Sequence, residues 1–155
     1  MEVKKVRGVK LFGILAVSVL FMTGCGGEKT LTCTNSEESS GIKMNQEVTM
    51  TFKDDKVTYV KMSIDNEATD DTIVDNWDMF ASMLDSQFEE TEKDGVSLKT
   101  NNNKDKHTYN VSLEIDLTKA SDDALAEYGL DGIADEKATY EDTKKEAEAD
   151  GFTCK

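Results

Sequence analysis

The stretch Tyr109-Asn110-Val111-Ser112-Leu113-Glu114-Ile115-Asp116-Leu117 alternates apolar and polar side chains over its whole length. Successive side chains of a β-strand point to opposite faces, so this pattern indicates a strand with one buried and one solvated face. Antiparallel sheets commonly have one face of each kind. We therefore predict a strand over Lys106–Leu117 that pairs with Val96–Thr100, in a hairpin joined by Asn101–Asp105.

A second hairpin is predicted upstream. Val48, Met50 and Phe52 alternate with polar residues, and the chain returns as Val57–Asp65 after a turn at Asp54-Asp55. A two-residue turn pairs Phe52 with Val57 and Met50 with Tyr59. Further along, the apolar residues are Val60, Met62 and Ile64, which have the opposite parity. Either the returning strand contains a bulge or its second half is covered on the other face.

An amphipathic helix is predicted between the hairpins. Thr69-Asp70-Asp71-Thr72 is typical of a helix start, because side-chain acceptors and negative charge favour the N-terminus. An apolar stripe follows, and the helix is expected to end near Asp94-Gly95; the stripe consists of Ile73, Trp77, Phe80, Leu84 and Phe88. Packing on the sheet is the favoured interpretation. The alternatives are a partner-binding helix and a membrane-lying helix, and the acidic polar face disfavours the latter.

The ends of the chain complete the predicted fold. Asn35–Gly41 is polar and reads as a loop, and Ser121–Tyr128 and Ala138–Asp150 read as helices. Gly151 ends the second helix, and Phe152–Lys155 is expected to be a strand. The predicted fold class is α+β. It has an antiparallel β-sheet of two hairpins plus terminal strands, with one amphipathic helix and two C-terminal helices packed on one face. Residues 31–155 form a single domain.

Two cysteines lie near opposite ends of this domain in similar contexts, Leu31-Thr32-Cys33-Thr34 and Phe152-Thr153-Cys154-Lys155. In an exported protein such a pair usually forms a disulfide, and we predict one between Cys33 and Cys154. The alternative is two free, redox-active thiols, but no Cys-x-x-Cys spacing supports it.

The first 25 residues have the organisation of an export signal. A basic segment with Lys4, Lys5, Arg7 and Lys10 precedes the apolar run Leu11–Met22. This run is shorter than the roughly 20 residues that a membrane-spanning helix needs.

The junction Thr23-Gly24-Cys25 resembles the lipobox of bacterial lipoproteins. The resemblance implies a signal peptide over residues 1–24, lipidation of Cys25 and a short tether over residues 25–30. Membrane lipid is then a partner through the acylated cysteine, on the extracytoplasmic face of the cell membrane. The alternative is a plain secretory signal whose cysteine is incidental.

The remaining chain is strongly acidic. Removing residues 1–24 removes four basic residues and one acidic residue, which leaves 14 basic and 31 acidic residues and a net charge of −17. Nucleic-acid binding needs basic patches, and none is visible. The charge favours solubility at the membrane surface, attraction of cations or a basic partner.

The sequence contains no convincing catalytic or metal-binding motif, so we expect no enzyme, no cofactor and no known small-molecule ligand. His107, the only histidine, is expected at a surface or strand edge. The best acidic cluster, Asp65, Glu67, Asp70 and Asp71, lacks the pattern of a calcium-binding EF-hand loop. The same holds for the second cluster, Asp131, Asp135 and Glu136. The only tryptophan, Trp77, lies on the predicted core stripe rather than in a sugar-binding cleft.

From Thr49 onward the chain resembles the YehR-like small bacterial lipoproteins, a family of uncharacterised function. The matching stretches are Thr51–Val57, Ile115–Ala120 and Glu146–Phe152. The resemblance implies a single α+β domain with an antiparallel sheet and brings no catalytic residues. We expect a binding or interaction module at the cell envelope, with an unknown envelope protein as a possible partner. The alternatives are a structural or stress-related envelope protein without a specific ligand, and a metal-dependent protein or enzyme.

Overall fold

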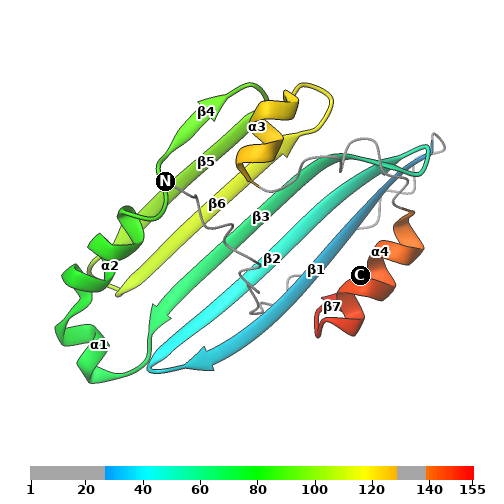
Figure 1. Cartoon of the computed structure of the whole chain (residues 1–155). Helices are drawn as coiled ribbons and strands as arrows, with labels where there is room; N and C mark the ends of the chain where they lie inside the picture. Colours follow the sequence, from blue (N-terminus) through cyan, green and yellow to red (C-terminus); the bar gives the residue numbers. More distant parts are fainter. Residues whose placement is uncertain (1–26, 129–138) are drawn as a thin grey trace, which may run out of the picture.

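A computed structural model of the chain describes residues 27–128 and 139–155. Within these residues, one antiparallel sheet forms the framework of the fold (Figure 1). Its strands are β1 (Glu28–Ser39), β2 (Ile42–Lys53), β3 (Lys56–Ala68), β4 (Thr91–Lys93), β5 (Val96–Asn103), β6 (Thr108–Asp116) and β7 (Thr153–Cys154). The helices are α1 (Asp71–Asp75), α2 (Trp77–Asp85), α3 (Asp122–Glu127) and α4 (Tyr140–Ala149). The predicted α+β class with an antiparallel sheet is confirmed.

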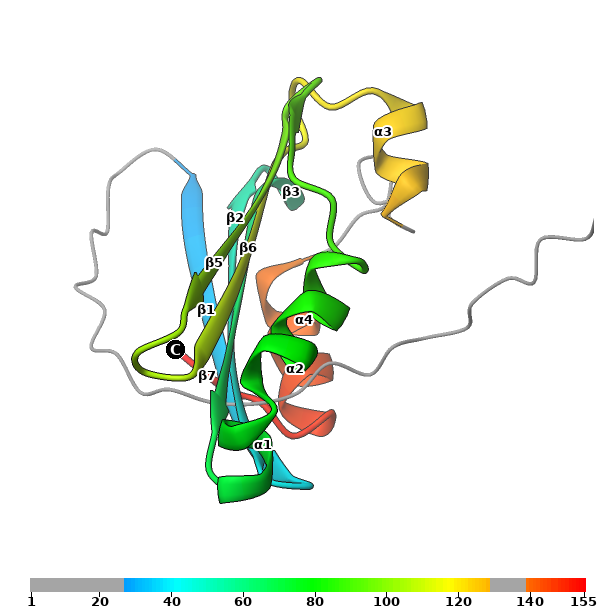
Figure 2. The same ribbon diagram turned by 90° about the vertical axis from the view of Figure 1, so that its left-hand side faces the viewer.

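The strand order in the sheet is β4-β5-β6-β3-β2-β1-β7. Both predicted hairpins are present as β2–β3 and β5–β6, and β3 pairs with β6 to join them. Figure 2 shows the described helices on one side of the sheet and no described helix on the other side. The chain therefore builds a two-layer structure in which one sheet face provides the floor of the core.

The returning strand was predicted either to contain a bulge or to be covered on its other face, and the β2–β3 hairpin contains the bulge. Phe52 pairs with Val57 as predicted, but the register then shifts, and Thr51 pairs with Tyr59. The predicted pairing of Met50 with Tyr59 is wrong, because Met50 pairs with Val60. The extra residue, Thr58, lets apolar residues on both sides of the bulge face the helices.

Three further predictions about elements are wrong. The predicted loop at Asn35–Gly41 is strand as far as Ser39, because β1 pairs with β2 along its whole length. The strand also starts at Glu28, so three residues assigned to the tether belong to the sheet. The single predicted helix is two helices that meet at Asn76, where the side-chain Nδ2 donates to Thr72 O at 2.8 Å. After α2 the chain extends into β4, a strand that no pattern in the sequence predicted.

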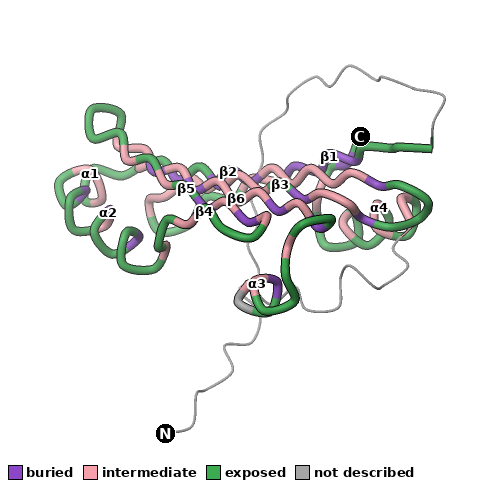
Figure 3. The backbone as a smooth tube through the Cα atoms, turned by 90° about the horizontal axis from the view of Figure 1, so that it is seen from above, coloured by how far each residue is buried: buried purple, intermediate pink, exposed green. Residues whose placement is uncertain are grey.

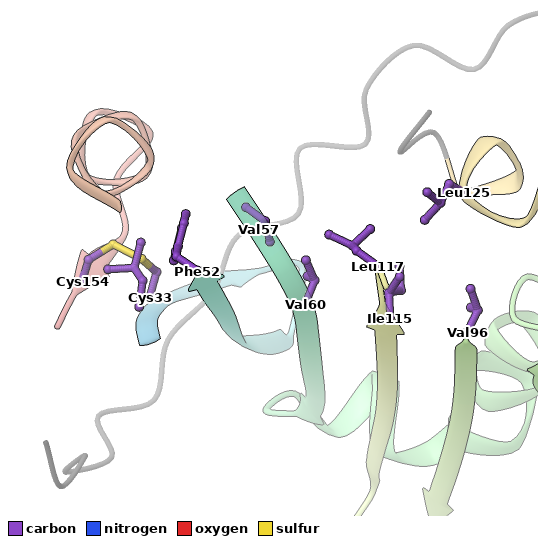
Figure 4. Close-up of a cluster of buried hydrophobic side chains, with 10 residues drawn as sticks. Cys33, Phe52, Val57, Val60, Val96, Ile115, Leu117, Leu125 and Cys154 are labelled. Carbon is purple, nitrogen blue, oxygen red and sulfur yellow. A yellow bond between two sulfur atoms is a disulfide. The ribbon is translucent and has the colours of Figure 1, made fainter. Parts of the chain in front are cut away.

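The apolar side chains form two clusters on the helix side of the sheet. Figure 4 shows the first cluster, to which the β-strands, the disulfide and Leu125 of α3 contribute. The second lies under α2 and contains Trp77, Ala81, Leu84, Tyr109 and Val111. Figure 3 shows the buried residues distributed along the sheet in alternation with more exposed ones. The alternation that predicted β6 is thus confirmed, with Tyr109, Val111, Ile115 and Leu117 buried.

Candidate functional site

The start of β1 lies beside the β2–β3 turn. Asp54 and Asp55 form this turn with φ angles of 52° and 59°, and a Cβ built on Gly27 would lie 3.7 Å from Asp54 Oδ1. The register of β1 places Glu28 opposite Lys53 at the same end of the sheet. Cys25, the predicted lipidation site, lies outside the described residues, two positions before Gly27. We call this end of the sheet the proximal end.

The predicted disulfide joins the first strand to the last. Cys33 and Cys154 are directly opposite in the β1–β7 pairing, with their Cα atoms 4.1 Å apart. Next to them, Thr32 and Lys155 exchange two backbone hydrogen bonds of 3.1 and 2.9 Å. Both cysteines are buried, and they lie close to Phe52 (Figure 4). The prediction of a Cys33–Cys154 disulfide is confirmed.

The uncovered face of the sheet carries polar side chains that bond across strands. Lys61 Nζ donates to Glu114 Oε1 at 2.6 Å. This hydrogen bond lowers the pKa of the Glu114 carboxyl and raises the pKa of Lys61. Further along the same face, Asn110 Nδ2 donates to Asp65 Oδ1 at 2.9 Å. The face is therefore an ordered, solvated surface, as the polar half of the β6 pattern predicts.

The opposite end of the sheet, which we call the distal end, has a shallow hollow of about 450 Å³. The junction of α1 and α2 forms one wall and the loop between β5 and β6 forms the other. Side chains of several chemical types line it, among them Asp75, Trp77, Asp78, Met79, Lys104 and His107. Lys104 Nζ lies 2.7 Å from Asp78 Oδ1 and bridges the two walls. This hydrogen bond raises the pKa of Lys104.

Trp77 and His107 make up the floor of the hollow. Trp77 is buried, as predicted, and its Nε1 donates to Asn102 Oδ1 at 3.0 Å. The His107 ring meets the indole edge-on, with ring centroids 5.9 Å apart. His107 has a φ of 49°, a conformation that is uncommon for a residue other than glycine. His107 is half-buried and lies just before β6, which begins at Thr108 rather than at the predicted Lys106.

The carboxylates of the first acidic cluster serve different local roles. Asp70 caps α1 by accepting from Thr72 N at 2.8 Å. Hydrogen bonding to the Thr72 side chain, and then to its backbone N–H, lowers the pKa of Asp70. Asp65 accepts from Asn110 on the open sheet face. In the described ranges 27–128 and 139–155, no three His, Cys, Asp or Glu side chains converge on a point that could hold a metal ion. The second cluster, Asp131, Asp135 and Glu136, lies outside those ranges.

The two edges of the sheet are further features that were not predictable from the sequence pattern. β4 and the Glu90 side chain protect one edge, and β7 covers part of the other. A signal existed for the hollow, because Asn76 interrupts the predicted helix and could have indicated a break. The loop that completes the hollow comes from a distant part of the chain, which no local pattern reveals. No described helix combines the length and apolar character needed to cross a membrane.

Comparison with known proteins shows similarity of fold. The sequence matches no family model and no curated protein. The structure is similar to the NMR structure of a protein from Streptococcus pneumoniae TIGR4, with a TM-score of 0.53 and 15% sequence identity. The similarity covers 100% of both chains. At this identity the match is evidence for the fold alone.

Proposed function

We propose that this protein is a lipid-anchored lipoprotein on the extracytoplasmic side of a bacterial cell membrane, where it acts as a binding module at the envelope. The observation that carries the proposal is the short distance along the chain between Cys25 and β1, which begins at Glu28. A lipid on Cys25 would hold the folded domain directly at the membrane surface. Membership of the YehR-like lipoproteins is part of the same proposal and rests on the three sequence stretches named above.

The disulfide supports the location. Disulfides persist in oxidising compartments outside the cytoplasm and are rare in reducing ones. Cys33 and Cys154 are separated by 121 positions in the sequence and meet in register. An exported domain retains such a bond, and a signal segment that ends at Cys25 would deliver it to that compartment.

The short connection also orients the domain. Cys25 and Gly27 are two residues apart, and an extended chain spans at most about 3.6 Å per residue, so the proximal end must lie within about 7 Å of the anchor. β1 has 12 residues, and a strand rises about 3.4 Å per residue, so its far end lies roughly 37 Å from its start. The hollow at the distal end would then face away from the membrane, where a partner can reach it.

The anchor is tested by labelling cells with a palmitate analogue. The wild-type protein should carry the label, and Cys25→Ser should lose it. The double variant Cys33→Ser/Cys154→Ser is the matched control, because it removes two cysteines and leaves the lipobox intact. Label that persists on Cys25→Ser, or wild-type protein released without label, would refute the anchor.

The binding role is tested by affinity isolation from detergent-solubilised membranes, using the anchored protein and Cys25→Ser in parallel. A partner enriched with the wild-type protein should be lost when Asp78→Ala and Met79→Ala alter the distal hollow, or when the sheet edge described below is altered. If no variant of the surface changes the enrichment, binding is not a property of the folded domain. If the protein enriches no partner, and deletion of its gene leaves the envelope unchanged, the alternative of a structural envelope protein without a specific ligand is favoured.

A further inference from the structure

The two edges of the sheet are protected to different degrees. At one edge, β4 pairs with β5 from Val96 to Leu98. Beyond β4, the Glu90 carboxylate accepts from the backbone N–H of Thr100 at 2.9 Å and from its hydroxyl at 3.2 Å. The exposed backbone of β5 is therefore capped by a side chain. Charged residues and short edge strands are common ways of preventing pairing with another chain.

The other edge is open at its distal half. Thr32 N–H and C=O point outward, because they bond to Lys155, the residue that follows β7. The backbone N–H and C=O groups of alternate strand residues point to the same side, and β1 pairs with β2 without a register shift. The N–H and C=O groups of Ser36 and Glu38 therefore also point outward, away from β2. No hydrogen bond from residues 27–128 or 139–155 reaches these two N–H and C=O pairs. Figure 1 shows the arrow end of β1 extending beyond β7.

The chain leaves room for an added strand at this place. The β1–β7 pairing ends at Thr34 opposite Thr153. Gly151, which has a φ of 93°, lies between α4 and β7 and turns the chain from the helix into the strand. An added strand opposite Ser36–Ser39 could make up to four backbone hydrogen bonds, two each with Ser36 and Glu38. Addition of an extended peptide to a free edge is a common mode of recognition, in which the main chain supplies affinity.

Charge decides between two kinds of occupant. Glu37 and Glu38 are both exposed at this edge. A second copy pairing through the same edge would place these carboxylates against their own copies, and like charges across a strand pair are destabilising. A segment with Lys or Arg at alternate positions would instead meet opposite charge. The net charge of the whole chain, −14, acts in the same direction.

We propose that an extended, basic protein segment binds by strand addition to the free edge of β1, opposite Ser36–Ser39. This proposal deepens the envelope-binding function and rests on it, since this half of β1 lies towards the distal end. Glu37 and Glu38 lie on opposite faces of the sheet, so basic residues at alternate positions of the added strand would meet one of these two carboxylates, whichever face they occupy. Strand addition requires no change in the fold, because the edge is already extended.

The test is an NMR titration of the full-length protein in detergent with the octapeptide Lys-Val-Lys-Val-Lys-Val-Lys-Val. Saturable shift changes should be confined to Ser36–Ser39 and their β2 neighbours, and amide exchange at Ser36 and Glu38 should slow. The peptide Lys-Lys-Lys-Lys-Val-Val-Val-Val has the same composition without alternation and should not slow exchange. Shift changes centred elsewhere, or no saturation, would overturn the proposal.

Variants separate strand addition from simple charge attraction. Ser36→Pro removes an outward N–H and no backbone hydrogen bond to β2, although it also removes the bond of 3.2 Å from Ser36 Oγ to Asn45 Oδ1 of β2. It should weaken binding at least tenfold. Thr30→Pro, which removes an outward N–H on the proximal side of β7, is the matched control and should bind as the wild type does. Equal binding by Ser36→Pro and the wild type would refute strand addition.

Charge reversal provides a second route if Ser36→Pro fails to fold. Glu37→Lys/Glu38→Lys should weaken binding at least tenfold, whereas Glu92→Lys on the opposite edge should leave it unchanged. An equal effect of both would refute the assigned edge, and a dimer that depends on Ser36 would identify a second copy as the occupant. Cys25→Ser cannot carry the lipid, so the same titration on this variant tests strand addition alone. Failure of the proposed lipid anchor and failure of the proposed strand addition can therefore be told apart.

Discussion

Trp77 links a helix, a strand and a loop through one side chain. It begins α2, its indole Nε1 donates to Asn102 of β5, and its ring contacts both Phe80 and His107. It is 3% exposed. A large aromatic residue contributes through burial and through ring geometry, and its N–H needs a partner when buried. All three conditions are met at this position.

Trp77→Ala should therefore lower the free energy of unfolding by about 3–5 kcal/mol, the range for loss of a buried aromatic side chain. Urea unfolding followed by circular dichroism measures the effect. Met79→Ala is the control on the same helix, because Met79 is 72% exposed, and it should change stability by at most about 0.5 kcal/mol. Similar effects of both substitutions, or a wild-type tryptophan emission that iodide quenches readily, would contradict burial.

The Lys61–Glu114 pair predicts a dependence of stability on pH. The bond to Lys61 lowers the pKa of Glu114 in the folded state. Its stabilisation is therefore fully present above the unfolded pKa of about 4.3 and is lost as pH falls through the lower folded pKa. The two side chains are 46% and 40% exposed, so the pair contributes at most about 1 kcal/mol.

Lys61→Met should weaken this dependence, since hydrogen bonding to Lys61 is the largest cause of the lowered Glu114 pKa and hydrogen bonding to Tyr59 contributes part of the rest. Its stability should fall less steeply than that of the wild type between about pH 5 and pH 3, and the two should differ by at most about 1 kcal/mol at pH 7. Lys93→Met is the control with the same change of charge at an exposed site. Unfolding midpoints measured at several pH values test this, and parallel curves for Lys61→Met and the wild type would show that the pair has no such effect.

Among the elements, β7 depends most on a covalent bond. It has two residues and pairs with β1 over Cys33 and Thr34. α4 leads into it and contacts β1. An edge strand this short provides few hydrogen bonds, so the disulfide holds α4 and β7 on the sheet.

Reduction of the disulfide should destabilise this end of the chain first. Opening a loop with a sequence separation of 121 residues should lower stability by about 4–5 kcal/mol in the chain-entropy description, and the melting temperature by roughly 10–20 °C. Amide exchange over residues 140–155 should accelerate before exchange in β3 and β6. Uniform acceleration across the sheet would indicate that the bond stabilises the whole domain rather than its C-terminal elements.

The individual strands and helices show which sequence patterns were sufficient to predict an element. β6 was predictable because one face is buried and the other solvated, so its alternation is complete. The distal half of β1 was not, because Asn35–Ser39 is polar on both faces and becomes a strand by pairing with β2. Asn76 signalled the α1–α2 break, but Ile73 and Trp77 continue the same apolar stripe across it, so the hydrophobic pattern favoured a single helix. Phe88 packs with this cluster although it lies beyond α2, so the stripe predicted its burial but not its helix.

At the scale of the whole molecule, the core was more predictable than the surfaces that could bind a partner. Buried residues reveal themselves by hydrophobic periodicity along the chain. The hollow and the free edge arise from contacts between distant segments, such as Lys104 with Asp78. Cys33 and Cys154 are the one pair of site residues that the sequence predicted correctly. The pair was predictable because two cysteines in an exported domain indicate a disulfide by their residue type alone.

The orientation of the domain on the membrane is the last prediction, and it follows from the separation of the two ends of the sheet. A fluorophore attached at Asp55→Cys, in the proximal turn, should be quenched by brominated lipids when the acylated protein is reconstituted in vesicles. A fluorophore at Asp105→Cys, in the distal β5–β6 loop, should not be, because it lies beyond the depth at which lipid quenchers act. Both positions are exposed turn residues of the same type, so each serves as the control for the other. Equal quenching at both positions would mean that the sheet lies flat on the bilayer. The distal hollow and the free half of β1 would then be close to lipid rather than directed towards a partner.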